Sequence, residues 1–119
     1  MSEFVEHVLE MLEHCGAIRA KRMFGGYGLY RDDLIFALVA DDVLYFKTDG
    51  ESRGLFEARG LSPFVYVKKG MPTKTSYYTA PEEVFDEPEA AETWVRIACE
   101  AALRFRNRPG KRSSRKRTA

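Results

Sequence analysis

The sequence is poor in the residues from which most metal sites are built. Its 119 residues include only two cysteines and two histidines. Cys15 and Cys99 lie far apart and neither belongs to a CxxC pair, so the simplest interpretation is two buried free thiols. His7 and His14 lie seven residues apart, and with Cys15 they do not form the short-spaced set of about four ligands that zinc needs. We therefore predict no metal site.

Long hydrophobic runs are also missing. No apolar stretch approaches the roughly 18 residues of a membrane span. The first residues, MSEFVEHVLEMLEHCG, carry four glutamates and lack the basic start of a signal peptide. We expect a cytoplasmic protein with no membrane partner. The length suits one domain, and 45% hydrophobic and 31% charged residues are ordinary for a soluble globular chain.

Nothing in the sequence assembles a catalytic nucleophile with a base. The serines lie in no nucleophile motif, and both histidines fall on one predicted helix. The acidic pairs Asp32–Asp33 and Asp41–Asp42 fall in predicted turns, where aspartate is favoured because it bonds the local backbone. We predict that the protein is not an enzyme and has no catalytic residue.

Charge is divided unevenly along the chain. Before Arg104 there are 11 basic residues against all 18 acidic ones, a net charge of −7, and eight basic residues follow. We predict a domain over 1–107 and a disordered basic tail over 108–119, because the tail has almost no apolar residue to pack. Five tail residues are candidates for sequence-independent phosphate contacts, namely Lys111, Arg112, Arg115, Lys116 and Arg117. The acidic body should oppose wide contact with DNA, so this binding should be weak.

Hydrophobic spacing predicts an α+β domain. The expected elements are a helix over 3–15, one or two strands within 18–30, strands over 34–40 and 43–47, a short helix within 49–60, strands over 64–68 and 74–80, and a helix over 88–107. Strands joined by two- or three-residue polar turns form antiparallel pairs. The order α-β(3–4)-α-β(2)-α therefore predicts a single antiparallel sheet with helices on one face.

A sheet covered on one face leaves its other face open. We expect Trp94 to be buried between the last helix and the sheet, because it belongs to the apolar stripe of that helix. Tyr66, Tyr77 and Tyr78 are expected to be exposed. A large uncovered aromatic surface usually marks an interface, which predicts a homodimer.

The most unusual stretch is RMFGGYGLY, residues 22–30. Its glycines, Gly25, Gly26 and Gly28, could suggest a loop that binds a nucleotide. A Walker loop would need Lys and Ser or Thr after the last glycine, and a dinucleotide loop would need a third glycine where Arg31 stands. We therefore predict no cofactor and interpret the glycines as a bend, a bulge or a close approach of another backbone.

The other residues of this stretch have structural interpretations too. Met23 and Phe24 would place large side chains around the bend. Arg22 has two interpretations, a functional cation or the partner of a carboxylate in the acidic body.

Three segments resemble the N-terminal domain of the TfoX/Sxy family of competence regulators. They are RMFGGYGLY, then IFALVADDVLYFKTD, then YYTAPEEVFDEPEAAETWVRIACEAA, in the family's order and spacing. The resemblance covers roughly residues 5–105. It implies an α+β fold similar to the type III secretion chaperones and an association with competence for DNA uptake. The resemblance supplies no catalytic residue. We assign its RMFGG motif a structural role in this chain.

Two functional hypotheses remain open. One is a regulatory module that acts mainly through contacts with an unidentified protein, with auxiliary non-specific contact between the tail and nucleic acid. The other is a dimeric protein-interaction or chaperone-like module with no role at nucleic acid, in which the tail only aids solubility or localisation.

Overall fold

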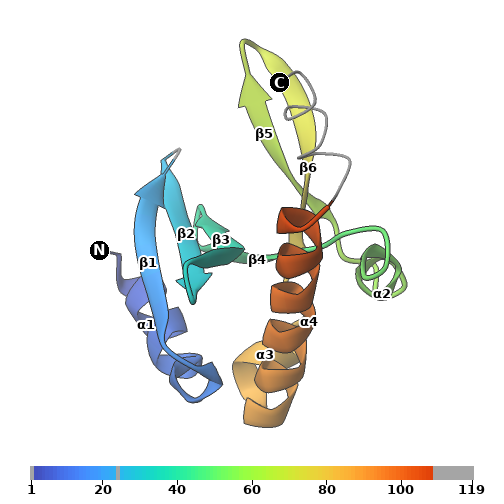
Figure 1. Cartoon of the computed structure of the whole chain (residues 1–119). Helices are drawn as coiled ribbons and strands as arrows, with labels where there is room; N and C mark the ends of the chain where they lie inside the picture. The colour runs from blue at the N-terminus through green and yellow to red at the C-terminus, as the bar shows by residue number, and fades with distance from the viewer. Residues whose placement is uncertain (1, 24, 109–119) are drawn as a thin grey trace, which may run out of the picture.

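The computed structural model describes residues 2–23 and 25–108. Within them, six antiparallel strands form one sheet in the order β1-β2-β3-β4-β6-β5 (Figure 1). The strands are β1 (Ile18–Met23), β2 (Gly26–Arg31), β3 (Leu34–Ala40), β4 (Val43–Lys47), β5 (Pro63–Lys68) and β6 (Met71–Thr79). The helices are α1 (Glu3–Met11), the 3-10 turn η1 (Glu13–Cys15), α2 (Arg53–Glu57), α3 (Glu83–Asp86) and α4 (Pro88–Arg106). The predicted α+β class and antiparallel sheet are confirmed.

Two helices differ from the sequence-based expectation. The first was expected over 3–15, but its α-helical part ends at Met11 and the rest is η1. Gly16, with φ of 116°, then turns the chain into β1. The helix α3 was not expected, because four residues are too few to show a hydrophobic period. No helix within the described residues is long and apolar enough to cross a membrane.

The paired aspartates build the hairpin turns between β2, β3 and β4. Asp32 and Asp33 have φ values of 54° and 62°, and Asp41 and Asp42 have 49° and 59°. Two consecutive residues with positive φ are typical of the type I′ turn, whose twist matches that of the flanking strands. The prediction of turns at these positions is confirmed.

One face of the sheet forms the core. Leu29, Phe36 and Phe46 on this face are fully buried beneath α1 and α4. Phe36 occupies a bulge that the register skips, since Leu29 pairs with Ala37 and Tyr30 with Ile35. The bulge turns its ring inward, 6.4 Å from the ring of Phe46.

Tyr78 belongs to this core, so the expectation that it is exposed is wrong. It pairs with Phe46 across β4 and β6, which directs both side chains to the helix side. Its ring lies 6.0 Å from that of Phe56, and its hydroxyl donates a hydrogen bond to Glu57 over 2.9 Å. Trp94 is buried, as predicted, with 7% of its surface exposed, and its ring lies 5.0 Å from that of Phe56 on α2.

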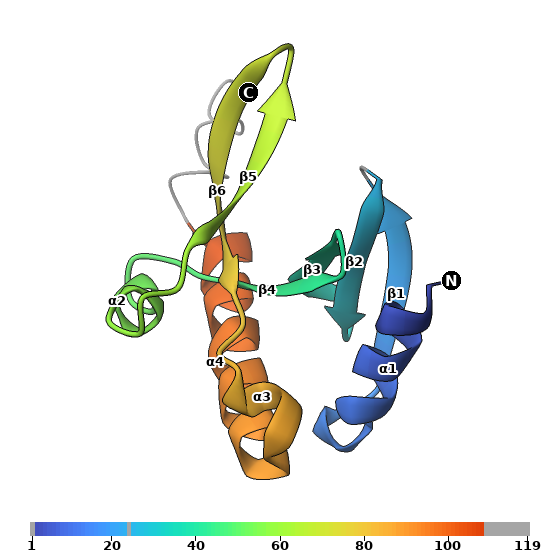
Figure 2. The same ribbon diagram turned by 180° about the vertical axis from the view of Figure 1, so that it is seen from behind.

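The sheet is folded into two arms. The β1–β2 pair forms one arm and the β5–β6 hairpin forms the other, with β3 and β4 between them (Figures 1 and 2). The face opposite to the core lies between these arms and carries no helix among the described residues. This open face is the surface that the fold leaves available for binding.

Candidate functional site

The glycine-rich segment is a β-hairpin. Met23 pairs with Gly26, so the chain reverses direction between these two residues. Gly25 has φ of 79°, a value that side-chain-bearing residues rarely adopt. The segment is therefore two strands joined by a tight turn, rather than one strand with a bend. Phe24 lies outside the described residues.

The other two glycines allow neighbouring groups to approach closely. A Cβ atom on Gly26 would lie 2.2 Å from the carbonyl oxygen of Val39 on β3. A Cβ atom on Gly28 would lie 2.8 Å from the sulfur of Met23 and from the Cδ1 atom of Ile35. Gly26 thus matches the predicted close approach of another backbone, and Gly28 makes room for Met23 to lie over β2.

Arg22 is exposed, and its guanidinium lies 5.9 Å from the centre of the Tyr27 ring. Among the described residues, the ion pairs do not include one between Arg22 and a carboxylate. The structure therefore gives this arginine an aromatic contact in place of the carboxylate partner suggested by the sequence.

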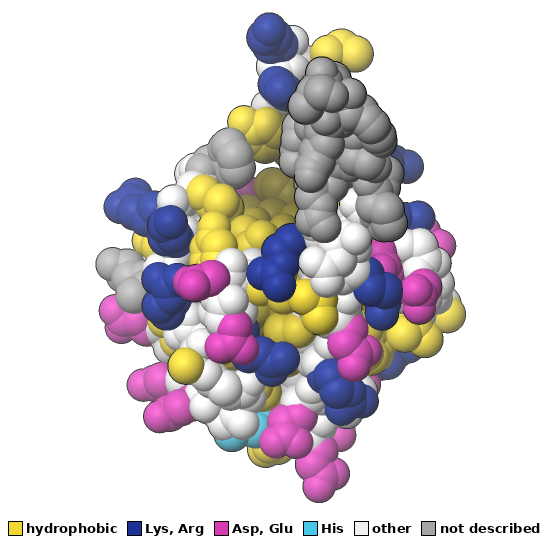
Figure 3. Space-filling view, viewed as in Figure 1, with side chains coloured by type: hydrophobic (Ala, Val, Ile, Leu, Met, Phe, Trp, Pro, Cys, Tyr) yellow, Lys and Arg dark blue, Asp and Glu magenta, His cyan; other side chains and the backbone are white. Residues whose placement is uncertain are grey.

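The open face has an apolar groove at its centre. Side-chain alternation along the strands places the rings of Tyr30, Tyr45, Phe64, Tyr66 and Tyr77 on this face. A pocket of about 240 Å³ lies among them, lined by Met23, Ile35, Leu38, Phe64, Tyr66, Thr75 and Tyr77. Figure 3 shows hydrophobic side chains at the bottom of the hollow between the two arms. Residues from β1, β3, β5 and β6 meet here, although they are far apart in the sequence.

The strands of this sheet are basic and contain no acidic residue. Seven of the 11 basic residues before Arg104 lie in strands, namely Arg19, Lys21, Arg22, Arg31, Lys47, Lys68 and Lys74. All 18 acidic residues lie in helices, turns and connections. The net charge of the body thus conceals a separation of charge between its sheet and the rest. The sequence already contained this signal, since none of the predicted strands includes Asp or Glu.

Tyr77 is the most strongly perturbed phenol of the open face. Burial, followed by the nearby Tyr30, raises the pKa of Tyr77 to about 12. Its hydroxyl therefore stays protonated at physiological pH, where it can donate a hydrogen bond but carries no charge.

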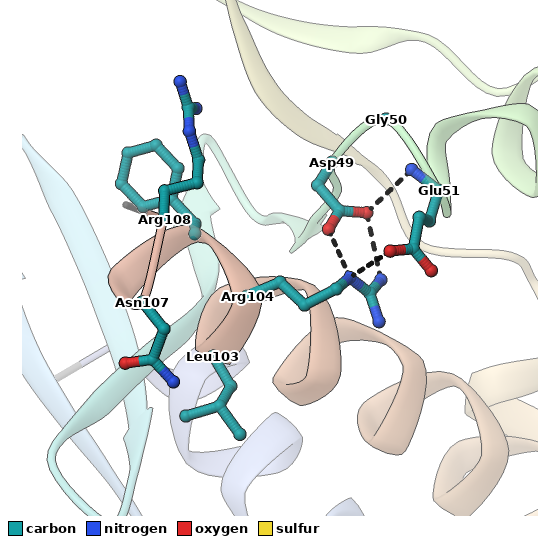
Figure 4. A pocket seen from close by; sticks show the side chains of 8 residues that line it. Asp49, Gly50, Glu51, Leu103, Arg104, Asn107 and Arg108 are labelled. Atoms are coloured by element: carbon teal, nitrogen blue, oxygen red, sulfur yellow. Dashed lines mark hydrogen bonds and ion pairs between the residues drawn. The ribbon is translucent and has the colours of Figure 1, made fainter. Parts of the chain in front are cut away.

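A second hollow lies at the end of α4. It has a volume of about 680 Å³ and is lined by Asp49, Gly50, Glu51, Leu103, Arg104, Phe105, Asn107 and Arg108 (Figure 4). Arg104 donates two hydrogen bonds to Asp49, from Nε over 2.6 Å and from Nη2 over 3.0 Å. Its Nε also lies 3.4 Å from a carboxylate oxygen of Glu51. The carboxylate of Asp49 further accepts bonds from the backbone N–H groups of Glu51 and Ser52, so it is fully engaged.

This ion pair joins α4 to the loop after β4. We expect its removal to lower the free energy of unfolding by a measurable amount. Hydrogen bonds from Arg104 lower the pKa of Asp49 to about 2, against a usual value near 3.9. Asp49→Asn should reduce the free energy of unfolding at pH 7 by about 1–2 kcal/mol, after allowance for screening by solvent. The native carboxylate binds protons less readily than the unfolded one, so its stabilisation is present above about pH 4 and is lost as the pH falls toward 2.

Urea unfolding of both proteins at several pH values tests this prediction. The difference between wild type and variant should be constant from pH 7 to about pH 5 and shrink below that. Glu51→Gln is the matched control, because the Glu51 side chain is 73% exposed and its effect should be small. A difference that stays the same at pH 3 would contradict the assignment to Asp49.

The two cysteines and His14 occupy structural positions in the fold. Cys15 and Cys99 are free and buried, and burial raises the pKa of the Cys99 thiol to about 11. The Nε2 atom of His14 lies 2.9 Å from the carbonyl oxygen of Pro88, where it links η1 to α4. Within residues 2–23 and 25–108, no group of three or more His, Cys, Asp or Glu side chains is placed to hold a metal ion.

The candidate nucleic-acid residues of the tail, Lys111, Arg112, Arg115, Lys116 and Arg117, lie outside the described residues. Their role stays a prediction.

The sequence of this chain matches known proteins over most of its length. The TfoX N-terminal domain family matches residues 10–102, which include every strand, the RMFGG hairpin and most of α4. This chain belongs to the TfoX N-terminal domain family. It is 32% identical over 100 residues to the DNA transformation protein TfoX1 of Aliivibrio fischeri (strain ATCC 700601 / ES114). The aligned region covers 84% of this chain and 48% of that relative, so this TfoX-type chain spans about half the relative's length.

Proposed function

We propose that this chain is a non-enzymatic regulatory module that promotes DNA transformation by binding other macromolecules in the cytoplasm. The observation that supports this best is the family match over residues 10–102, together with a relative named as a DNA transformation protein. The groove on the open face is apolar, and the polar side-chain groups in its lining are the hydroxyls of Thr75, Tyr66 and Tyr77. Such a surface suits binding better than acid–base chemistry.

Protein contact is proposed at the free edge of β5. Among the described residues this strand ends the sheet, so one side of its backbone is available to pair with another strand. Val65 and Val67 are 45% and 62% exposed and lie on the side of the hairpin that faces away from the groove. An exposed apolar edge strand is a template for pairing, and a second copy of β5 would extend the sheet and place its own valines beside these two. We propose that the protein is a homodimer joined in this way.

Self-association at this edge gives a direct test. Wild type at tens of micromolar should scatter light as a particle of twice the 13.6 kDa chain mass, and Val67→Glu should scatter as a monomer. A glutamate there would replace the apolar cross-strand contact with a charge that loses part of its hydration on pairing, which opposes association. The same variant should lower transformation frequency when it replaces the wild-type gene in its host.

Leu55→Glu is the matched control. Leu55 is 48% exposed on α2, away from β5, and its replacement should leave both the mass and the transformation frequency unchanged. A monomeric wild type would disprove the β5 dimer. A host whose transformation frequency does not depend on the gene would disprove the regulatory function.

The basic tail is proposed to make auxiliary, non-specific contacts with nucleic acid. Its five central basic residues offer about four to five phosphate contacts, which are electrostatic and weaken steeply with salt.

A further inference from the structure

We propose that the open face of the sheet binds single-stranded nucleic acid, with unpaired bases against its aromatic rings and phosphates against its basic rims. This goes beyond the proposed function, which assigns nucleic-acid contact to the tail alone. The inference rests on three features of the face: the sign of its charge, the position of its rings and the shape of its groove.

The first feature is a basic surface without competing carboxylates on its strands. Arg19 and Lys21 lie on the open face of β1, and Lys68 lies on the same face of β5. Lys69 follows Lys68 in the turn at the tip of the hairpin. Arg19 also pairs with the turn residue Asp33, but the pair is open to solvent, since the exposed fractions of the two side chains are 60% and 89%. Both arms therefore present cations to a polyanion lying between them.

The second feature is a row of rings between these cations. Tyr45 and Phe64 have ring centres 5.0 Å apart, and the ring of Tyr30 lies within 6.0 Å of Arg19 and 5.7 Å of Lys21. All three aromatic side chains are only partly buried. Proteins that bind single strands combine a positive groove with partly exposed rings on which successive bases stack, and this stacking tolerates any base sequence.

The third feature is the apolar pocket of about 240 Å³ in the floor of the groove. Tyr66 and Tyr77 contribute rings to its wall, and Thr75 and Met23 lie beside them. A duplex keeps its bases stacked and paired, so it cannot place one against this wall. An unpaired base can, which is why the arrangement favours a single strand over duplex DNA.

The alternative to single-stranded nucleic acid is a protein ligand that binds the same face. An acidic peptide would satisfy the cations but would not use several rings spread over β2, β4, β5 and β6. Val65 and Val67, which we assign to self-association, lie on the side of β5 opposite to Tyr66 and Lys68, and light scattering of each variant reports whether the dimer is retained.

The experiment is fluorescence anisotropy with the full-length protein and a labelled oligothymidylate of about 15 nucleotides. Tyr66→Ala should weaken binding by about tenfold or more, and Tyr66→Phe should restore most of the affinity because it keeps the ring. Lys68→Gln with Lys69→Gln should weaken binding by roughly tenfold at low salt. It should also reduce the steepness of log K against log salt by about 1.4, or roughly 0.7 for each lost contact.

Two further variants show whether binding belongs to the open face. One removes the contribution of the tail, and the other tests the effect of losing positive charge elsewhere on the protein. Glutamine at Lys111, Arg112, Arg115, Lys116 and Arg117 removes the tail contacts, and the Tyr66→Ala loss should persist in that background. Lys74→Gln with Arg96→Gln removes the same charge from the helix side of the hairpin and from α4, and should change affinity by less than about threefold.

The proposal fails on any of three results. Loss of all binding in the tail variant, with no effect of Tyr66→Ala in either background, would assign nucleic acid to the tail only. Equal affinity for a duplex of the same sequence would exclude base stacking. Displacement of the oligonucleotide by a polyglutamate peptide of equal charge, at equal concentration, would indicate an acidic protein ligand. A retained thermal transition in each variant ensures that the comparison is between folded proteins.

Discussion

Trp94→Ala should reduce the free energy of unfolding by about 3–5 kcal/mol, the largest effect that we expect of a single substitution in this protein. The indole is 7% exposed and its ring lies 5.0 Å from that of Phe56 in an edge-to-face arrangement. Its Nε1–H donates a hydrogen bond to Glu83 over 3.1 Å, and Arg59 lies 5.7 Å from the ring centre. The side chain thus joins α4 to α2 and α3, and alanine would leave a cavity bounded by all three.

Urea unfolding followed by far-ultraviolet circular dichroism measures this loss, since Trp94 is the only tryptophan and its fluorescence disappears with it. Trp94→Phe is the control that separates packing from hydrogen bonding. It keeps most of the ring volume and loses only the bond to Glu83, so it should cost about 1–2 kcal/mol. Glu83 also pairs with Arg59, which limits the penalty for its lost partner. A cost below about 1 kcal/mol for Trp94→Ala would mean that the site collapses around the missing ring.

The sequence predicted those elements that are set by local chemistry. The aspartate pairs at 32–33 and 41–42 located two turns, because few residues adopt positive φ so readily. Helix α4 was predicted over 88–107 and spans Pro88–Arg106, because its apolar stripe keeps a regular helical spacing along its whole length.

The orientation of individual strand residues could not be predicted in the same way. Adjacent residues in a strand point to opposite faces, so Tyr77 and Tyr78 cannot both be exposed on one face. The pairing of Tyr78 with Phe46 decides which one is buried, and that register is a long-range property. The bulge at Phe36 was equally hidden, because LIFALVA is apolar throughout and shows no alternation that a bulge would break.

The binding surface could be predicted only in part. The net charge of the body suggested that its surface would repel nucleic acid. That single number adds the basic residues of the strands to the acidic residues of the helices and turns. Assembling the sheet separates the two signs, because the acid-free strands become neighbours. The groove itself brings Met23, Ile35, Phe64 and Tyr77 together, and this depends on the β4–β6 pairing that joins the two arms.

Substitution of Gly26 should cause the second large loss of stability, because the backbones of β2 and β3 pack closely at this residue. A Cβ atom there would lie 2.2 Å from the carbonyl oxygen of Val39 and 3.3 Å from its carbonyl carbon. The clash is with main chain, so no rotamer change relieves it, and β2 and β3 must separate. We expect Gly26→Ala to reduce the free energy of unfolding by about 2 kcal/mol and Gly26→Val by about 3 kcal/mol.

Two other glycines serve as controls, because each isolates a different cause. Gly25 has φ of 79°, and apart from Gly25 and its two chain neighbours no described atom lies within 4 Å of the place that a methyl group would occupy, so Gly25→Ala measures backbone strain, about 1 kcal/mol. Gly54 lies in α2 with open space around it, so Gly54→Ala should be neutral or stabilise the protein by up to about 1 kcal/mol. Chemical unfolding of the four variants should therefore rank Gly26→Val as the least stable, followed by Gly26→Ala, Gly25→Ala and Gly54→Ala. If Gly26→Ala were as stable as wild type, the close approach of β3 would not be what requires glycine in this hairpin.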